Sequence, residues 1–158
     1  YADSSYAEYK KIYDEIFEYN PVEPTDTIHF ATDIQGRVLY SDSTIVSYQR
    51  TLYTYAGGAH GMNTKTNYVF NLKTGKLLTE EDLFGKDFER KIQKRLTEKA
   101  NILRQQDMLP EEDIFYSNSN ITPNGNFAIT DTSIIYTFNP YEIAPYVYGI
   151  IDIEITKN

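Results

Sequence analysis

Two short segments of the sequence combine residue types that could do chemistry. The first runs from Tyr55 to Gly61 (YAGGAHG) and has glycine at three of its last five positions. Glycine adopts positive φ angles freely, so exposed N–H groups around Gly57 and Gly58 could form a concave anion-binding site. His60 could serve there as a general base or as a ligand. The alternative is structural, with the His60 ring fixing the turn through hydrogen bonds to backbone carbonyls.

The second segment runs from Asn139 to Gly149 (NPYEIAPYVYG) and contains two prolines and three tyrosines. A stiff aromatic loop loses little conformational entropy when it meets a partner. We therefore expect this segment to recognise a partner. The candidate binding residues of the two segments are Tyr55, Gly57, Gly58, His60, Tyr141, Glu142 and Tyr146.

Glu142 allows two interpretations. Its neighbours in the sequence are largely apolar, and a carboxyl group in such a setting can act as a general acid or base. Alternatively, the carboxylate accepts hydrogen bonds from backbone N–H groups or pairs with a cation, and so holds the loop. The first interpretation, combined with His60, describes a hydrolase, whereas the second describes a binding loop.

Other catalytic and metal-binding patterns are missing. The sequence has no cysteine, and its two histidines are His29 and His60. It lacks the HExxH zinc motif, the GxSxG nucleophile motif, the phosphate-binding GxxxxGK loop and the dinucleotide fingerprint. We therefore expect no cofactor and no metal ion, and assign no catalytic residue.

Composition narrows the function classes further. The 158 residues match the size of a single domain with one sizeable core. Lys and Arg number 15 against 23 Asp and Glu, and the resulting net charge of −8 would repel a nucleic-acid backbone. No apolar run approaches the roughly 20 residues that a membrane-spanning helix needs. We therefore expect one acidic domain, with no nucleic-acid partner and no membrane span, whose oligomeric state stays open.

Two regions at the start of the chain have distinct patterns. Residues 1–20 predict a short amphipathic helix, since Ser5 and Glu8 have capping-box spacing and apolar residues follow at helical intervals. Residues 25–158 are expected to form the core of the domain. Alternating residues there predict strands from Ile28 to a stop at Gly36, from Arg37 to Ser41, from Ile45 to Tyr55 and from Lys65 to Leu72.

The second half predicts one long helix followed by further strands. Thr79 and Asp82 have capping spacing ahead of an apolar stripe that continues to Leu103. A long loop is expected from residue 108 to 125, then a hairpin of 127–130 with 134–138, then a strand buried through Ile151, Ile153 and Ile155. Two groups of strands with a helix between them predict an α+β domain, in which the long helix packs on an antiparallel sheet.

The two candidate segments, taken with the stretch between them, carry a family resemblance. YAGGAHG, then FNLKTGK at 70–76 with Leu83-Phe84, then FNPYEIAPY at 138–146 resemble the RsiV-type C-terminal domain, over roughly Ile28 to Ile155. This extracytoplasmic bacterial family is catalogued as a domain of unknown function. It occurs in envelope lipoproteins, in an anti-sigma factor whose ectodomain recognises lysozyme, and beside deacetylase domains that act on cell-wall glycans.

The resemblance implies a non-catalytic binding or sensor module of a bacterial envelope or secreted protein. Such a module would be periplasmic, lipid-anchored or secreted, and its ligand would be a protein such as lysozyme or a cell-wall glycan. Because the sequence begins at Tyr1 and not at methionine, we expect a processed or trimmed chain, from which any export signal or lipid anchor has been removed. The alternative is an envelope hydrolase that acts on cell-wall material through His60 and a carboxylate such as Glu142.

Overall fold

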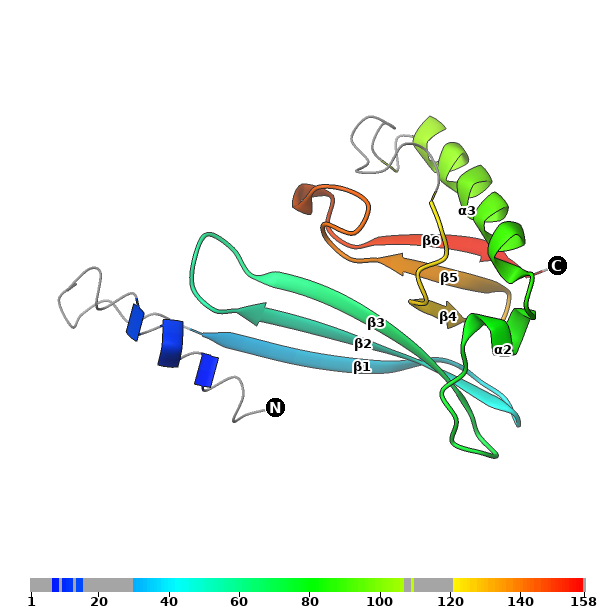
Figure 1. The fold of residues 1–158 in the computed structure, drawn as a ribbon, viewed down its shortest axis with the longest axis horizontal. Coiled ribbons are helices and arrows are strands. Elements are labelled where there is room, and N and C mark those ends of the chain that lie inside the picture. Colours follow the sequence, from blue (N-terminus) through cyan, green and yellow to red (C-terminus); the bar gives the residue numbers. More distant parts are fainter. Residues whose placement is uncertain are drawn as a thin grey trace. The chain divides into compact units, whose positions relative to one another are not determined.

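The computed structural model describes residues 7, 8, 10–12, 14, 15, 30–106, 109 and 121–157 (Figure 1). The chain divides into two units, one of Tyr1–Asp33 with Tyr53–Met62 and the other of Ile34–Leu52 with Asn63–Asn158. The described residues form two antiparallel three-stranded sheets, with strand orders β1-β2-β3 and β4-β5-β6, and one long helix. The predicted α+β class is confirmed.

The smaller unit contains the predicted N-terminal helix. Residues 7, 8, 10–12, 14 and 15 are helical, within the predicted range 1–20. Lys11 and Glu15 form an ion pair of 4.0 Å along this helix, and both side chains are exposed, so the pair adds little stability. The predicted capping residue Ser5, the end of the helix and the expected strand start at Ile28 lie outside the described residues.

The first sheet consists of β1 (Ala31–Ser41), β2 (Ile45–Tyr55) and β3 (Met62–Asn71). Asp42 closes the turn between β1 and β2, because its Oδ1 accepts the N–H groups of Thr44 and Ile45 at 2.6 and 2.8 Å. Side chains alternate along each strand, so one face of the sheet carries Arg37, Gln49, Lys65 and Asn67.

The prediction that a strand ends at Gly36 is wrong, because β1 runs through this residue without a break. A Cβ atom added to Gly36 would lie 1.7 Å from the hydroxyl oxygen of Tyr48 on the neighbouring strand. Gly36 therefore leaves room for an aromatic ring across the pair of strands and does not stop the strand.

The predicted long helix is two helices, α2 (Glu80–Phe84) and α3 (Phe88–Gln105). The capping prediction is confirmed, since Thr79 and Asp82 form a reciprocal capping box at the start of α2. Gly85 then adopts a φ angle of 81°, which is outside the helical region and ends α2. None of the helices described here is long and apolar enough to cross a membrane.

The second sheet consists of β4 (Phe127–Ile129), β5 (Ser133–Phe138) and β6 (Ile151–Thr156), with the short 3₁₀ helix η2 (Tyr146–Tyr148) before β6. The predicted hairpin and final strand are confirmed. In β6 buried residues alternate with exposed ones, and α3 packs against this strand (Figure 1). The apolar core includes Ile92, Leu96 and Ala100 of α3 and Phe127, Ile134, Tyr136, Phe138, Ile151, Ile153 and Ile155 of the sheet.

Candidate functional site

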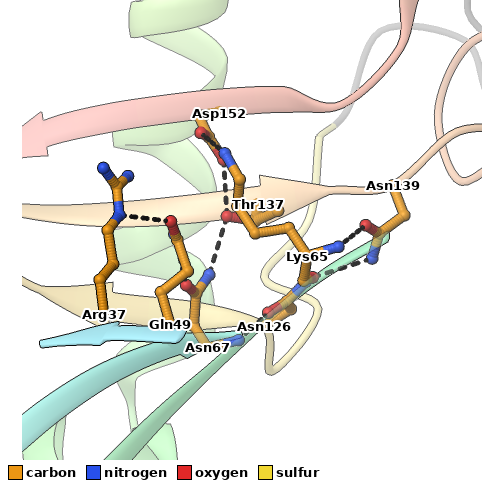
Figure 2. Close-up of polar contacts among 8 residues, drawn as sticks. All are labelled: Arg37, Gln49, Lys65, Asn67, Asn126, Thr137, Asn139 and Asp152. Carbon is orange, nitrogen blue, oxygen red and sulfur yellow. Dashed lines mark hydrogen bonds and ion pairs between the residues drawn. The ribbon is translucent and has the colours of Figure 1, made fainter. Parts of the chain in front are cut away.

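The edge of β3 is closed by two asparagine side chains from the other end of the chain (Figure 2). Asn126 Oδ1 accepts the Asn67 N–H at 2.9 Å, and Asn126 Nδ2 donates to the Lys65 carbonyl at 2.9 Å. Asn139 Oδ1 accepts the Lys65 N–H at 2.7 Å, and its Nδ2 donates to the same carbonyl at 3.2 Å. The two side-chain amides pair with backbone N–H and C=O groups of β3 that an edge strand otherwise leaves without a partner strand.

A chain of side-chain hydrogen bonds crosses from the first sheet to the second. Arg37 Nε donates to Gln49 Oε1 at 3.0 Å, and Gln49 Nε2 donates to Asn67 Oδ1 at 2.9 Å. Asn67 Nδ2 donates to Thr137 Oγ1 at 2.8 Å, and that hydroxyl donates to Asp152 Oδ1 at 2.6 Å. Every bond points from the guanidinium toward the carboxylate, so each one polarises the next and strengthens it.

The middle of this chain is buried and its end is ion-paired. Gln49, Asn67 and Thr137 are 3%, 6% and 0% exposed. Lys65 Nζ lies 2.5 Å from the second carboxylate oxygen of Asp152. Buried polar groups are tolerated when all of them are hydrogen-bonded. The residues of this hydrogen-bond chain, which come from five strands, meet that condition.

Sequence patterns did not reveal this network. Gln49, Asn67 and Thr137 each stand in an alternating strand, where a polar residue ordinarily faces solvent. The Asn67–Thr137 bond joins positions 70 residues apart, so no local spacing marks it.

The second candidate segment forms a loop that Glu142 holds in place. Glu142 Oε1 accepts from Asn139 Nδ2 and Oε2 accepts from Asn124 Nδ2, both at 3.2 Å. The same Asn124 amide donates to the Thr137 carbonyl at 2.9 Å. Glu142 thus holds the loop through asparagine amides, in place of the backbone N–H groups or the cation considered from the sequence.

Tyr141 and Tyr146 lie together on this loop. Tyr141 has a φ angle of 72°, and its N–H donates to the Ala144 carbonyl at 3.1 Å. The ring centroids of Tyr141 and Tyr146 are 5.8 Å apart at an interplanar angle of 33°, a geometry at which aromatic pairs attract. Ala144 between them is buried, so it anchors the loop to the core.

An open, largely apolar groove runs beside this loop. Its volume is 580 Å³, and its lining consists of Thr51, Asn63, Pro140, Tyr146, Val147, Gly149 and Ile150. Val147 is 82% exposed and Tyr141 is 50% exposed, which is high for apolar and aromatic residues in a loop with this many internal contacts. Tyr146 is therefore the one predicted binding residue that lines the groove, and the tilted ring of Tyr141 lies beside it.

The first candidate segment forms the loop between β2 and β3, in the smaller unit. Gly57 and Gly58 have φ angles of 84° and 93°, and the Tyr55 hydroxyl donates to the Gly58 carbonyl at 2.9 Å. His60 Nδ1 lies 3.1 Å from the Gly61 carbonyl, a contact within the loop itself. Tyr55, Gly58 and His60 thus belong to one loop, and they belong to a different unit from Tyr141, Glu142 and Tyr146.

Acidic groups elsewhere give no metal site. The described residues contain no cluster of three or more His, Asp or Glu side chains that could hold a metal ion.

Burial raises the pKa of the Tyr136 hydroxyl in the core, and the negative charge of Glu80 raises it further. Burial also raises the pKa of Glu80. Interactions with the Tyr136 hydroxyl and the Gly125 N–H lower this pKa and offset part of the rise.

One family model matches the C-terminal part of the chain. Residues 81–158 match the model of a family described as a protein of unknown function (DUF3298). Among curated proteins, none matches the chain. The expected domain of unknown function is therefore confirmed for this part of the chain.

Two solved structures share the fold. A member of the DUF3298 family from Bacteroides fragilis superposes with a TM-score of 0.73 at 22% identity, covering 95% of this chain and 59% of its own. A DUF3298 family protein from Pseudomonas aeruginosa superposes with a TM-score of 0.63 at 21% identity, covering 91% of this chain and 64% of its own. The chain spans about three fifths of the length of each of these proteins.

Proposed function

We propose that the chain is an RsiV-type binding module of an extracytoplasmic bacterial protein, and that the loop from Asn139 to Gly149 contacts its partner. The observation that carries this proposal is the combination of a rigid backbone with an exposed apolar surface. Glu142 and the Tyr141–Tyr146 pair fix the loop before any partner arrives. A surface that is already ordered loses less entropy on binding.

The chemistry of the groove favours a protein partner over a glycan. Val147, Ile150 and Pro140 provide branched and cyclic aliphatic surface, and Tyr146 adds an aromatic ring with a polar end. Such mixtures are typical of the central contacts in protein interfaces. Glycan sites usually offer flat aromatic faces, and the sequence has no tryptophan.

Binding assays with two named probes test the proposal. Lysozyme, which the family resemblance indicates, serves as the protein probe, and soluble peptidoglycan fragments serve as the glycan probe. We expect lysozyme to bind, and Val147→Asp to weaken that binding by about tenfold or more because it places a charge in the apolar contact. Val38→Asp is the matched control, since Val38 on β1 is 60% exposed and is not among the residues that line the groove.

Three results would contradict the proposal. One is that neither probe binds the folded chain. Another is that Val38→Asp and Val147→Asp weaken binding equally. The third is turnover of peptidoglycan that His60→Ala abolishes without loss of folding, which would establish the hydrolase alternative.

A further inference from the structure

A second, polar pocket lies on the face of the first sheet that carries the hydrogen-bonded chain. Its volume is 310 Å³, and its lining consists of Gln35, Gly36, Arg37, Gln49, Thr51 and Lys65. No carboxylate is among these lining residues. Thr51 also lines the loop groove, so the two hollows adjoin, but they differ in chemistry.

Gln49 fixes the orientation of the Arg37 side chain. Its Nε donates to Gln49 Oε1, and Gln49 is held in turn by Asn67 and is 3% exposed. Figure 2 shows Nε as the nitrogen that bonds Gln49, with the two terminal nitrogens of Arg37 beyond it at the end of the side chain. These two N–H groups form a fork that matches the two oxygens of a carboxylate.

The charges around the pocket leave one positive group uncompensated. Lys65 is paired with Asp152 at 2.5 Å, and Asp152 accepts a second hydrogen bond from Thr137. Among the residues that the structure describes, no Asp or Glu lies within ion-pair distance of Arg37. Among the lining residues in the described part of the chain, Arg37 is thus a cation without an ion pair, on a protein whose net charge is −8.

We propose that this pocket binds a small monocarboxylate ligand, with the carboxylate on the terminal nitrogens of Arg37. A single uncompensated guanidinium balances one negative charge, whereas a doubly charged phosphate needs further cations. Thr51 and Lys65 line the same pocket, and Thr51 offers a hydroxyl as a further hydrogen-bond donor. The pocket adjoins the loop groove at Thr51, but Arg37 and Gln49 do not line that groove, so this proposal does not depend on whether the 139–149 loop binds a protein.

Titration of the full chain with propionate, followed by backbone amide NMR at low ionic strength, tests this proposal. Propionamide is the neutral isostere and inorganic phosphate is the competing anion. We expect saturable shifts near Arg37, Thr51 and Lys65 with propionate only. Arg37→Gln should weaken propionate binding by about tenfold or more, whereas Arg90→Gln, which removes the same charge from exposed surface of α3, should leave it unchanged.

A second variant separates geometry from charge. Arg37→Lys keeps the positive charge but has no fork, so propionate should bind it several-fold more weakly than it binds the wild type. Equal shifts with propionamide, equal affinity of wild type and both Arg37 variants, or tighter binding of phosphate than of propionate would each overturn the assignment.

Discussion

Tyr48 of β2 lies across Gly36 of β1 so closely that a Cβ atom at position 36 would be 1.7 Å from the tyrosine hydroxyl oxygen. The same relationship recurs in the smaller unit, where a Cβ atom on Gly61 would be 2.3 Å from the ring of Tyr53. The Tyr48 ring also lies 6.3 Å from the ring of Tyr68 on β3. In both Gly–Tyr pairs, glycine allows an aromatic ring to cover the neighbouring strand.

Gly36→Ala should therefore destabilise the protein, by roughly 1–3 kcal/mol, because the added methyl group displaces the Tyr48 ring. In a Tyr48→Ala background the ring is gone, so the same change should be neutral or slightly stabilising, since alanine has less backbone entropy to lose than glycine. Urea unfolding of the four proteins measures this coupling. Equal effects of Gly36→Ala in both backgrounds would show that the ring contact is not the cause.

Thr137→Val should be destabilising by roughly 1–3 kcal/mol although it conserves the volume of the side chain. The hydroxyl accepts from Asn67 and donates to Asp152, so its loss leaves a buried donor and an acceptor without their partner. Thr156→Val on the exposed face of β6 is the control and should change the free energy of unfolding little. Similar losses of unfolding free energy at the two positions would argue that the buried hydrogen-bond chain does not stabilise the fold.

Asp82 gives the first pH prediction. The Lys76 ammonium, followed by the Thr79 N–H, lowers the pKa of Asp82 to about 2 from the ordinary value of 3.8. A lowered pKa in the folded state stabilises above the unfolded pKa, and this stabilisation is lost as pH falls toward 2. Asp82→Asn should lower the urea midpoint at pH 6, and the difference from wild type should vanish between pH 4 and 2.

Asp87→Asn is the control for that experiment, because Asp87 is the N-cap of α3 but its side chain makes no capping hydrogen bond. A difference between wild type and Asp82→Asn that persists unchanged at pH 2 would mean that the carboxylate charge is not responsible.

Glu80 gives a prediction of opposite sign. Burial raises its pKa above the ordinary value of 4.5, so the folded state favours the protonated form. Its contribution is therefore fully present below pH 4.5 and is lost as pH rises through the folded pKa. Glu80→Gln stays neutral throughout, so wild type should lose stability relative to this variant as the pH rises above 4.5. Thermal unfolding checks this, with the exposed Glu81→Gln as control, and a pH-independent difference would contradict it.

Elements that bury one regular face were predictable from the residues alone. The alternation of Ile151, Ile153 and Ile155 predicted β6, and the fourfold spacing of Ile92, Leu96 and Ala100 matches the buried side of α3. The capping box of Thr79 and Asp82 was also visible, because its two residues are three positions apart. A loop around Tyr141 and Tyr146 was also predicted, because two prolines flank this stretch ahead of the final strand.

Two glycines differ in what fixes their role, a tertiary contact with Tyr48 at Gly36 and the local positive φ angle that ends α2 at Gly85. The sequence pattern predicts a strand end at Gly36 and the interior of a helix at Gly85. In the structure Gly36 lies within β1, and Gly85 ends α2. Glycine tolerates many conformations, so its neighbours in space select one, and Tyr48 makes that selection at Gly36.

The sequence by itself determined the fold class and the two unusual loops, because short-range periodicity reports which face of a helix or strand is buried. Only the tertiary structure decided that Gln49, Asn67 and Thr137 are buried partners and that Arg37 faces a polar pocket. A polar residue in a strand has the same local pattern whether it meets water or another side chain. Its hydrogen-bond partner, here up to 70 positions away in the sequence, depends on how the two sheets pack together.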